Sequence, residues 1–316
     1  MSKPYVRPDL QQFLDLLATF DAPKMSDVGP VAAREMMRQM GQFNVPVGEI
    51  AVMRDCDMTG PDGQVIPLRL YDCKAERGPS PALVFLHGGG FVIGDRDCYD
   101  SLCVRFSHEF DMPVVSVEYR LAPEHPWPAC PDDCEAAARW VAQSPAELGR
   151  TVTGMIVAGD SAGGALAAVT AMALRDKPAA VPLLAQWLLY PVTDTSTVYG
   201  SYKSFKEGYM LEMDAMKWFI DLYAGDASNW RCSPIKGETA GLAPAVVHTC
   251  SLDPLRDEGR AFAAKLVQAG VPTIYLEAEG MVHGFTNFGV AIPSSLDDLA
   301  ASIAAMKMLL AAKLGG

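Results

Sequence analysis

Apolar residues in the first 45 positions recur at the spacing of a helix rather than that of a strand. Two groups follow this spacing: Leu10, Phe13, Leu14 and Leu17, and then Met36, Met37 and Met40. Residues three or four positions apart share one face of a helix. The pattern therefore predicts about two amphipathic helices in this segment.

The spacing then changes to an alternation of apolar and polar residues. Residues 48–58 and 65–72 are predicted to be strands, joined by the turn-forming residues Thr-Gly-Pro-Asp-Gly at 59–63. In the second strand, apolar residues occupy every second position from Ile66 to Leu70. This alternation is typical of a half-buried, antiparallel edge of a sheet.

From residue 82 onward, strands are predicted from short, uninterrupted apolar runs. These runs are Ala82–Leu86, Pro113–Val117, Met155–Ala158, Leu183–Leu189 and Ala245–Val247, with a last strand at Thr273–Glu277. Helical patterns lie near 97–110, 130–143, 162–175, 256–269 and 295–313. Apolar runs suit strands buried on both faces, and alternation with helices makes the sheet parallel. We therefore predict an α/β fold with a mostly parallel, eight-stranded sheet flanked by helices, its first two strands antiparallel.

One segment interrupts this alternation. Residues 192–235 follow a strand without leading promptly to the next one, and they are rich in Tyr, Phe, Met and Trp. A long insertion at the end of a strand is usually functional, for example as a lid. We predict that residues 1–45 and 192–235 form a helical cap over an α/β domain made of residues 46–191 and 236–316.

Composition narrows the class of protein. Half of the 316 residues are hydrophobic, which rules out intrinsic disorder. The chain has 26 Lys and Arg against 38 Asp and Glu, which gives a formal net charge of −12. Nucleic acids and anionic membranes bind basic surfaces, so neither is expected as the main partner.

The sequence also bears on location and on metal binding. The N-terminal residues lack the apolar stretch of a signal peptide, and no charge-free apolar run is long enough for a transmembrane helix. None of the eight cysteines is spaced C-x-x-C, and no histidine cluster accompanies them. We therefore expect a cytoplasmic protein with reduced thiols and no zinc site.

The strongest chemical signal is Gly-Asp-Ser-Ala-Gly-Gly at 159–164, between a predicted strand and an alanine-rich helix. It fits G-x-S-x-G, in which the serine occupies a strained strand-to-helix turn and small neighbours let the backbone pass closely. The helix N-terminus adds positive potential where negative charge develops. A glycine turn with an incidental serine is the alternative, but both flanking elements favour Ser161 as a nucleophile.

A second signal is His-Gly-Gly-Gly at 87–90, directly after a predicted strand. Successive glycines let the backbone turn its N–H groups toward one point, as an oxyanion hole requires. We predict Gly88 and Gly89 as two donors and Ala162 as a third, and we expect His87 to be structural. A phosphate-binding loop is the alternative, but no Walker A lysine pattern follows.

The order of residues along the chain selects the histidine. Triads built on this turn run serine, acid, histidine, and His248 and His283 are the two histidines that follow Ser161. His248 lies inside an apolar strand and is expected to be a core residue. His283 lies in a loop just past the last strand, where α/β sheets place their active sites. We therefore predict His283 as the general base.

The acid should lie between these two residues and at the end of a strand. Asp253 is in that position, with Pro254 fixing the turn. Asp257 and Glu258 fall in the first turn of the next helix, where negative charge is favoured for capping and dipole reasons. Asp253 is therefore the predicted acid.

Five motifs together resemble the bacterial hormone-sensitive-lipase-like family (family IV) of α/β-hydrolases. They are HGGGF at 87–91, EYRLAPEHPWPA at 118–129, GDSAGG at 159–164, DPLRDEG at 253–259 and HGF at 283–285, in the order found in the family. The resemblance implies hydrolysis of carboxylic esters by Ser161, Asp253 and His283. It also implies a cap above the site and, often, a homodimer formed through the edge of the last strand.

The insertion also suggests the walls of a substrate pocket. We predict Phe205, Tyr209, Met210 and Leu211 as walls, with Trp187 and Tyr190 at the strand below. Rigid aromatic walls and adaptable methionines favour esters of short to medium acyl length as the small-molecule substrate. Amide, lactone or carbonate cleavage on the same triad stays open. A non-catalytic ligand receptor is a weaker alternative because His283 is present, and the proposed chemistry needs no metal or cofactor.

Overall fold

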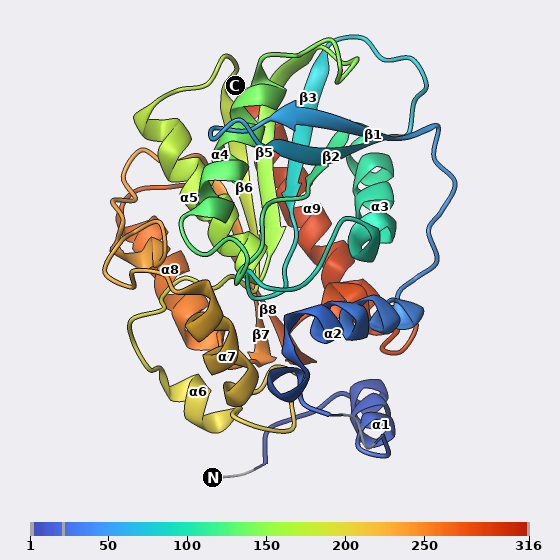
Figure 1. Cartoon of the computed structure of the whole chain (residues 1–316), viewed down its shortest axis with the longest axis vertical. Helices are drawn as coiled ribbons and strands as arrows, with labels where there is room; N and C mark the ends of the chain where they lie inside the picture. Colours follow the sequence, from blue (N-terminus) through green and yellow to red (C-terminus); the bar gives the residue numbers. More distant parts are fainter. Residues whose placement is uncertain (1–2, 21–22, 315–316) are drawn as a thin grey trace.

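The computed structural model describes residues 3–20 and 23–314 and contains an eight-stranded sheet (Figure 1). The strands are β1 Val52–Thr59, β2 Val65–Asp72, β3 Ser80–Leu86, β4 Val114–Val117, β5 Val152–Asp160, β6 Leu183–Leu189, β7 Ala245–Leu252 and β8 Thr273–Val282. Their order across the sheet is β1-β2-β4-β3-β5-β6-β7-β8. β1 pairs antiparallel with β2, β2 pairs antiparallel with β4, and the other pairs are parallel. The predicted fold class is confirmed.

Two strands run further than their apolar residues indicate. The sequence predicts residues 155–158 for β5, but the parallel pairing of β5 with β6 continues as far as Asp160. Similarly, β8 continues beyond residue 277 because Val282 pairs with Leu252 of β7. Backbone pairing, rather than hydrophobicity, therefore sets where these strands end.

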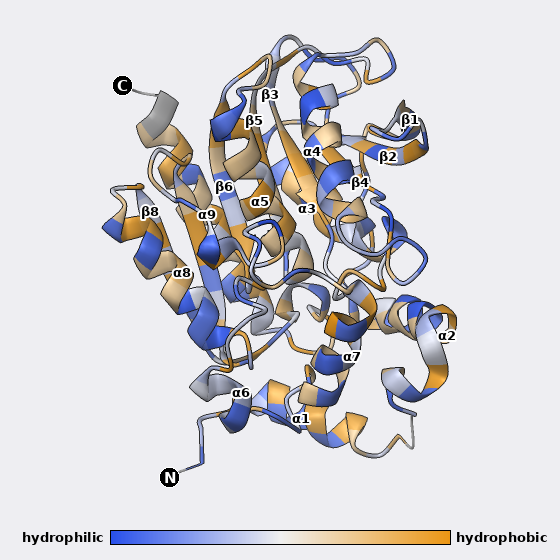
Figure 2. Ribbon diagram, turned by 60° about the vertical axis from the view of Figure 1, so that its left-hand side comes forward, coloured by the Kyte–Doolittle hydropathy of each residue, from blue (hydrophilic) through white to orange (hydrophobic). Residues whose placement is uncertain are grey.

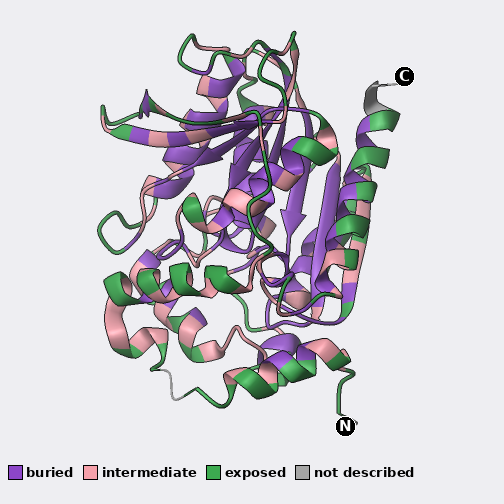
Figure 3. Ribbon diagram, turned by 90° about the vertical axis from the view of Figure 1, so that its right-hand side faces the viewer, coloured by how far each residue is buried: buried purple, intermediate pink, exposed green. Residues whose placement is uncertain are grey.

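Helices cover both faces of the sheet. α3 (Asp100–Phe110) and α9 (Ser295–Leu314) lie on one face, and α4 (Ala129–Ala142), α5 (Ala162–Asp176) and α8 (Arg256–Gln268) lie on the other (Figure 1). The central strands carry hydrophobic residues along their length (Figure 2). These strands are buried almost throughout, whereas α9, the helix next to the label C, has exposed residues on its outer side (Figure 3). The sheet therefore has a separate core on each face.

α5 is the most deeply buried of these helices. Its residues from Ala162 to Leu174 are all buried, and most of them are Ala or Gly. Small side chains let the helix lie close to β5 and to α4 at the same time. None of the helices formed by residues 3–20 and 23–314 combines the length and the apolarity needed to cross a membrane.

The remaining long helices gather beyond the carboxyl ends of the parallel strands. α1 (Pro8–Leu17), α2 (Met25–Met40) and α7 (Met213–Tyr223) lie there, with the short α6 (Gly200–Ser204) near α8 (Figure 1). α2 packs against α7, so the N-terminal segment and the insertion meet. The division into cap and α/β domain stays a prediction, and residues 1–2 and 21–22 of the cap and 315–316 of the α/β domain lie outside the described residues.

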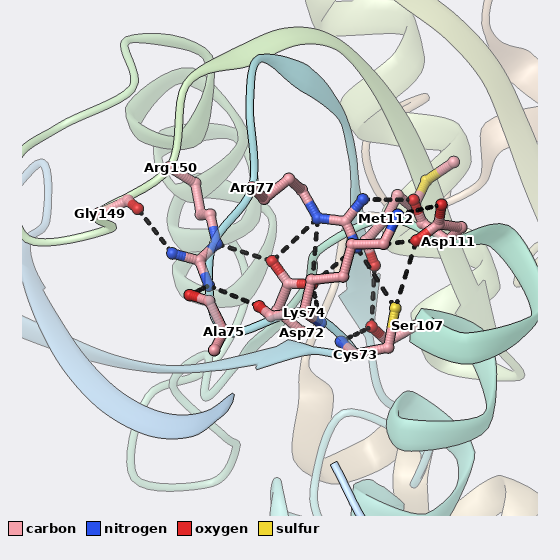
Figure 4. Close-up of polar contacts among 10 residues, drawn as sticks. All are labelled: Asp72, Cys73, Lys74, Ala75, Arg77, Ser107, Asp111, Met112, Gly149 and Arg150. Carbon is pink, nitrogen blue, oxygen red and sulfur yellow. Dashed lines mark hydrogen bonds and ion pairs between the residues drawn. The ribbon is translucent and has the colours of Figure 1, made fainter. Parts of the chain in front are cut away.

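A buried ion cluster holds the opposite end of the sheet, at the end of β2. Asp72 is fully buried and accepts hydrogen bonds from Arg77 Nη2 at 2.8 Å, Arg150 Nε at 2.7 Å and the Lys74 N–H at 2.9 Å (Figure 4). Burial acts to raise the pKa of Asp72, but the hydrogen bonds from Arg77, Lys74 and Arg150 outweigh it, so the pKa lies below its ordinary value. The ionised carboxylate therefore ties the end of β2 to the loops that precede β3 and β5.

We predict that Asp72→Ala lowers the free energy of unfolding by about 3 kcal/mol or more, since it leaves two guanidinium groups without their buried partner. Urea titration measures this loss. The folded pKa of Asp72 lies below the unfolded one, so the contribution is complete above about pH 4 and is lost as the pH falls through the folded pKa. The difference in the free energy of unfolding between wild type and Asp72→Ala should therefore become smaller in acid.

Asp111→Ala is the matched control. Asp111 binds Lys74 and Arg77 at the surface, where its side chain is 59% exposed, and its loss should cost less than about 1 kcal/mol. Equal losses in the two variants would contradict the role assigned to the buried carboxylate.

Candidate active site

Ser161 lies in the turn between β5 and α5. Its backbone has φ 54° and ψ −119°, a conformation that residues with side chains rarely adopt. A side-chain carbon at Gly159 would lie 2.2 Å from the Gly163 carbonyl oxygen, and one at Gly163 would lie 1.9 Å from the Leu86 carbonyl oxygen. The two glycines therefore permit the backbone contact that this strained turn requires.

The structure brings the three predicted triad residues into one hydrogen-bonded line. Ser161 Oγ lies 2.8 Å from His283 Nε2, and His283 Nδ1 lies 2.8 Å from Asp253 Oδ2. Asp253 is fully buried, and its other oxygen accepts the Leu255 N–H at 2.8 Å. In such a line, the carboxylate orients the imidazole and the imidazole can take the serine proton.

The other two histidines near the sheet are packed into the core. His248 is buried in β7, where burial lowers its pKa to about 4, so it is neutral at pH 7. His87 is also buried; its ring stacks on Tyr119 with a centroid distance of 4.3 Å, and its Nδ1 lies 2.7 Å from the Gly88 carbonyl oxygen. These positions agree with the structural roles expected for both residues.

Gly88 does not present its N–H to the site, so its prediction as an oxyanion donor is wrong. The Gly88 N–H donates to Asp160 Oδ1 at 2.7 Å and lies 3.2 Å from Tyr99 Oη. The acceptor comes from the aspartate beside the nucleophile, 72 positions further along the chain. A local glycine pattern cannot indicate that one of its N–H groups has a distant partner.

Gly89, which was predicted, and Gly90, which was not, line the cavity beside Ser161. Their φ angles are 120° and 60°. A side-chain carbon added at Gly89 would lie 2.1 Å from the Ile93 carbonyl oxygen, and one added at Gly90 would lie 2.3 Å from the Phe219 ring. Within residues 3–20 and 23–314, no hydrogen bond uses the N–H of Gly89, Gly90 or Ala162. These three N–H groups could therefore bind an anionic oxygen.

A cavity of about 200 Å³ opens beside Ser161 and His283. Its walls are mainly apolar and come from α2, α7 and three loops: Met25, Met37, Met40, Ile93, Met210, Leu211, Ala215, Phe219 and Phe288. Polar groups are fewer: Asn44, Tyr99, Asp160 and Asn287. In the part of the chain that the structure describes, no group of His, Cys, Asp or Glu is placed to hold a metal ion.

Two of the six predicted pocket residues, Met210 and Leu211, line this cavity. Trp187 does not, because the alternation along β6 turns it into the core. There its ring lies 4.7 Å from that of Phe106, and its Nε1–H donates to Ser302 Oγ at 2.8 Å. The prediction placed Trp187 at the strand below the insertion but could not indicate which face of the sheet it occupies.

Tyr190, Phe205 and Tyr209 also lie outside the lining and support it instead. Tyr190 packs edge-on against His283 with ring centroids 4.8 Å apart. Phe205 and Tyr209 pack edge-on against each other at 5.4 Å. Their prediction as pocket walls is therefore wrong, because aromatic composition does not distinguish a wall from the core that supports it.

The methionines of α2 are the main cavity residues that the sequence reasoning missed. Met37 and Met40 belong to the helical pattern that predicted this segment, but they were not among the predicted pocket residues. Methionine is over-represented on adaptable binding surfaces, so several methionines on one helix face are a signal for a cavity wall.

α2 and α7 also contact the glycine loop, residues 88–91, and the residue that follows it. Arg34 of α2 donates from Nε to the Val92 carbonyl oxygen at 2.9 Å and from Nη2 to the Ala122 carbonyl oxygen at 3.0 Å. Tyr223 of α7 stacks on Phe91 with ring centroids 3.9 Å apart. The loop is therefore fixed by these helices as well as by β3.

Comparisons with known proteins show the family of this chain. Residues 83–287 match the profile of a family described as having the alpha/beta hydrolase fold. An ethyl acetate hydrolase of Pseudomonas putida is 35% identical over 96% of this chain and 98% of its own. Carboxylesterase NlhH of Mycobacterium tuberculosis is 36% identical over 98% of this chain and 99% of its own.

Solved structures give the same result. An ester hydrolase from the metagenome of Lake Arreo, in complex with a bipyridine phosphonate derivative, has a TM-score of 0.89 and 35% identity, with 95% of this chain and 98% of that chain covered. A thermostable esterase from Pseudomonas putida has a TM-score of 0.87 and 32% identity, with 98% and 97% covered. The chain therefore belongs to the alpha/beta hydrolase fold family, in the branch that resembles hormone-sensitive lipase.

Proposed function

We propose that this protein hydrolyses carboxylic esters of short to medium acyl length through an acyl-enzyme intermediate on Ser161. The observation that carries the proposal is the hydrogen-bonded line from Ser161 through His283 to Asp253, which opens on an apolar cavity. Family membership and the esterase relatives support the reaction class.

The reaction begins with attack by Ser161 Oγ on the ester carbonyl carbon while His283 Nε2 takes the hydroxyl proton. Asp253 accepts the Nδ1–H, which fixes the tautomer and stabilises the imidazolium that forms. His283 then gives the proton to the departing alcohol. Water attacks the acyl-enzyme by the same route and releases the acid.

The negative charge on the tetrahedral intermediate is held by backbone donors. We assign this role to the N–H groups of Gly89, Gly90 and Ala162, which have no other hydrogen-bond partner in the described residues. Ala162 is also the first residue of α5, so the positive end of the helix dipole faces the same oxygen. Each such donor is worth about 3 kcal/mol in hydrolases of this type.

Substrate size follows from the cavity. Part of its wall comes from the predicted cap segments, where α2, α7 and the 210–211 turn contribute large side chains, and the rest comes from loops of the α/β domain. Each methylene buried there adds about 0.8 kcal/mol, or about fourfold in kcat/KM, until the chain meets a wall. Esters with long acyl chains should therefore be poor substrates.

Two alternatives follow from the same site. Amide or lactone hydrolysis would use the same groups, and the esterase relatives favour the ester. A non-catalytic receptor would have no need for a histidine hydrogen-bonded to both Ser161 and Asp253, so this geometry favours an enzyme.

The predicted homodimer and the predicted cytoplasmic location go beyond what the relatives show. β8 is the edge strand on its side of the sheet, so a second copy could pair along it and give the homodimer that the resemblance implies. A cytoplasmic location stays a prediction from the sequence.

The triad is tested by two substitutions and a matched control. We expect Ser161→Ala and Asp253→Asn each to lower kcat by about 10³-fold or more, because the first removes the nucleophile and the second leaves the imidazole in the wrong tautomer. Asp257→Asn should stay within about threefold of wild type, since that carboxylate binds the Ser201 N–H and Arg256 instead. A fluorescent phosphonate should label the wild type once and Ser161→Ala not at all.

A reversed order of Asp253 and Asp257, or persistent labelling of Ser161→Ala, would sink the assignment. Thermal unfolding of each variant separates loss of chemistry from loss of the folded state.

Chain-length preference is tested with two series of esters, one of increasing acyl length and one of increasing alcohol length. We expect kcat/KM to rise and then fall within the short to medium range, and Met210→Ala to move the optimum to longer chains in one of the two series. Phe205→Leu is the control, because Phe205 packs behind the wall and should leave both optima in place. An optimum at long chains in wild type, or one that Met210→Ala does not move, would contradict the proposed pocket.

Light scattering over a range of concentrations tests the dimer. We expect a molar mass of twice that of the chain at micromolar concentration, because β8 is an edge strand that pairs with β7 alone among the strands of the described residues, and such an edge favours pairing with a second copy. A monomer at all concentrations would contradict pairing through β8.

A further inference from the structure

Asp160 is a buried carboxylate next to the nucleophile, and the mechanism above does not use it. It is the last residue of β5, and 2% of its surface is exposed. Among residues 3–20 and 23–314, no Lys, Arg or His forms an ion pair with it. An unpaired carboxylate is costly to bury, so its presence beside Ser161 points to a role in the site.

The carboxylate instead receives three hydrogen bonds from neutral groups. The Gly88 N–H donates to Oδ1 at 2.7 Å. The hydroxyls of Tyr99 and Tyr190 donate to Oδ2 at 3.0 and 3.5 Å. Burial raises the pKa of Asp160 to about 6, although the Tyr99 hydrogen bond and the charge of His283 act to lower it. Above that pH the group is an anion, and an anion is the stronger acceptor for these donors.

The first of these bonds sets the direction of the glycine loop. A side-chain carbon at Gly88 would lie 2.6 Å from Asp160 Oδ2, so the loop backbone rests directly on the carboxylate. With the Gly88 N–H turned toward Asp160, the next two residues, Gly89 and Gly90, face the cavity. The carboxylate thus holds one N–H group away from the substrate and fixes the loop that carries the following two.

The third bond reaches toward the loop that carries His283. The Tyr190 hydroxyl, which donates to Asp160, also lies 2.5 Å from Thr286 Oγ1. The Tyr190 ring packs edge-on against His283 and against Phe285. A single buried network therefore joins the glycine loop, the residue before the nucleophile and the histidine loop.

We propose that Asp160 is a positioning residue that holds the oxyanion donors of the glycine loop in register with Ser161 and His283. The proposal rests on the function proposed above and names a residue that this function requires but that takes no part in bond making. A positioning role differs from a purely structural one in what a substitution changes. The donors bind the oxyanion of the transition state, so their misplacement lowers kcat and leaves binding of the ester in its ground state largely unchanged.

The experiment compares Asp160→Ala and Asp160→Asn with wild type. We expect Asp160→Ala to lower kcat by about 100-fold, the scale of losing one well-placed oxyanion donor, with KM within about threefold. Asp160→Asn should lose less, about tenfold, because an amide oxygen can still accept the Gly88 N–H. A trifluoromethyl ketone, which forms an oxyanion on Ser161, should lose affinity in each variant by the same factor as kcat/KM.

Asp133→Asn is the matched control. Asp133 is equally buried and also accepts a backbone N–H, that of Arg120 at 3.0 Å, but it lies outside the cavity. This variant should lower the unfolding temperature and leave kcat and ketone affinity near those of wild type. If Asp160→Ala does not fold, then Asp160→Asn and Tyr99→Phe provide the same comparison, with losses in kcat and in ketone affinity expected for both.

The proposal is overturned if the Asp160 variants keep kcat within about threefold of wild type, or if they change KM alone. It is also overturned if Asp133→Asn loses as much kcat as Asp160→Asn at equal stability. Ser161→Ala distinguishes failure of the proposed function from failure of the positioning role. If Ser161→Ala is active, the proposed function is wrong; if it is inactive and the Asp160 variants have normal activity, only the positioning role is wrong.

Discussion

The close approach of two backbone segments, the end of β3 and the start of α5, is the constraint on which the site depends. Gly163 lies so near the Leu86 carbonyl oxygen that no side chain fits between them. This approach forces the turn at Ser161 into its strained conformation and directs the serine toward the loops that follow β3 and β8. It also explains why α5 consists mostly of small residues, since the helix must stay close to the sheet along its whole length.

The two ends of the sheet have different tasks. At the carboxyl ends of the parallel strands, loops from β3, β5, β7 and β8 bring the reacting groups together, and the helices above them supply apolar walls. Those helices also contact the glycine loop and the residue that follows it, through Tyr223 and Arg34, so the same helices support the cavity wall and the loop that carries the proposed oxyanion donors. At the other end, the ion cluster around Asp72 joins loops that carry no chemistry and acts on stability.

Three of the buried carboxylates in this chain are accommodated in three different ways. Asp72 is paired with two arginines and stays ionised. Glu258 accepts the Thr193 N–H at 2.7 Å and bonds the Tyr202 hydroxyl, and its burial raises its pKa to about 8, so at neutral pH it is largely protonated. Asp160 has neutral donors alone and lies beside the nucleophile. Of the three, Asp160 borders the cavity, and at neutral pH it is the one that is ionised without a counter-ion among the described residues, as expected where charge is kept for a function rather than for stability.

The sequence by itself determined the order and type of the main elements, because the spacing of apolar residues along a strand or a helix is a local property. It also predicted Ser161, Asp253 and His283 as a group, since the strained turn and the strand ends impose a fixed order along the chain. The tertiary structure alone decided which N–H groups of the glycine loop are free, because Gly88 meets an acceptor 72 positions away. In the same way, it decided that Trp187 faces the core and that methionines of α2 face the cavity. Such choices depend on packing between segments that are distant in the sequence, and local spacing carries no information about which distant segment a side chain will meet.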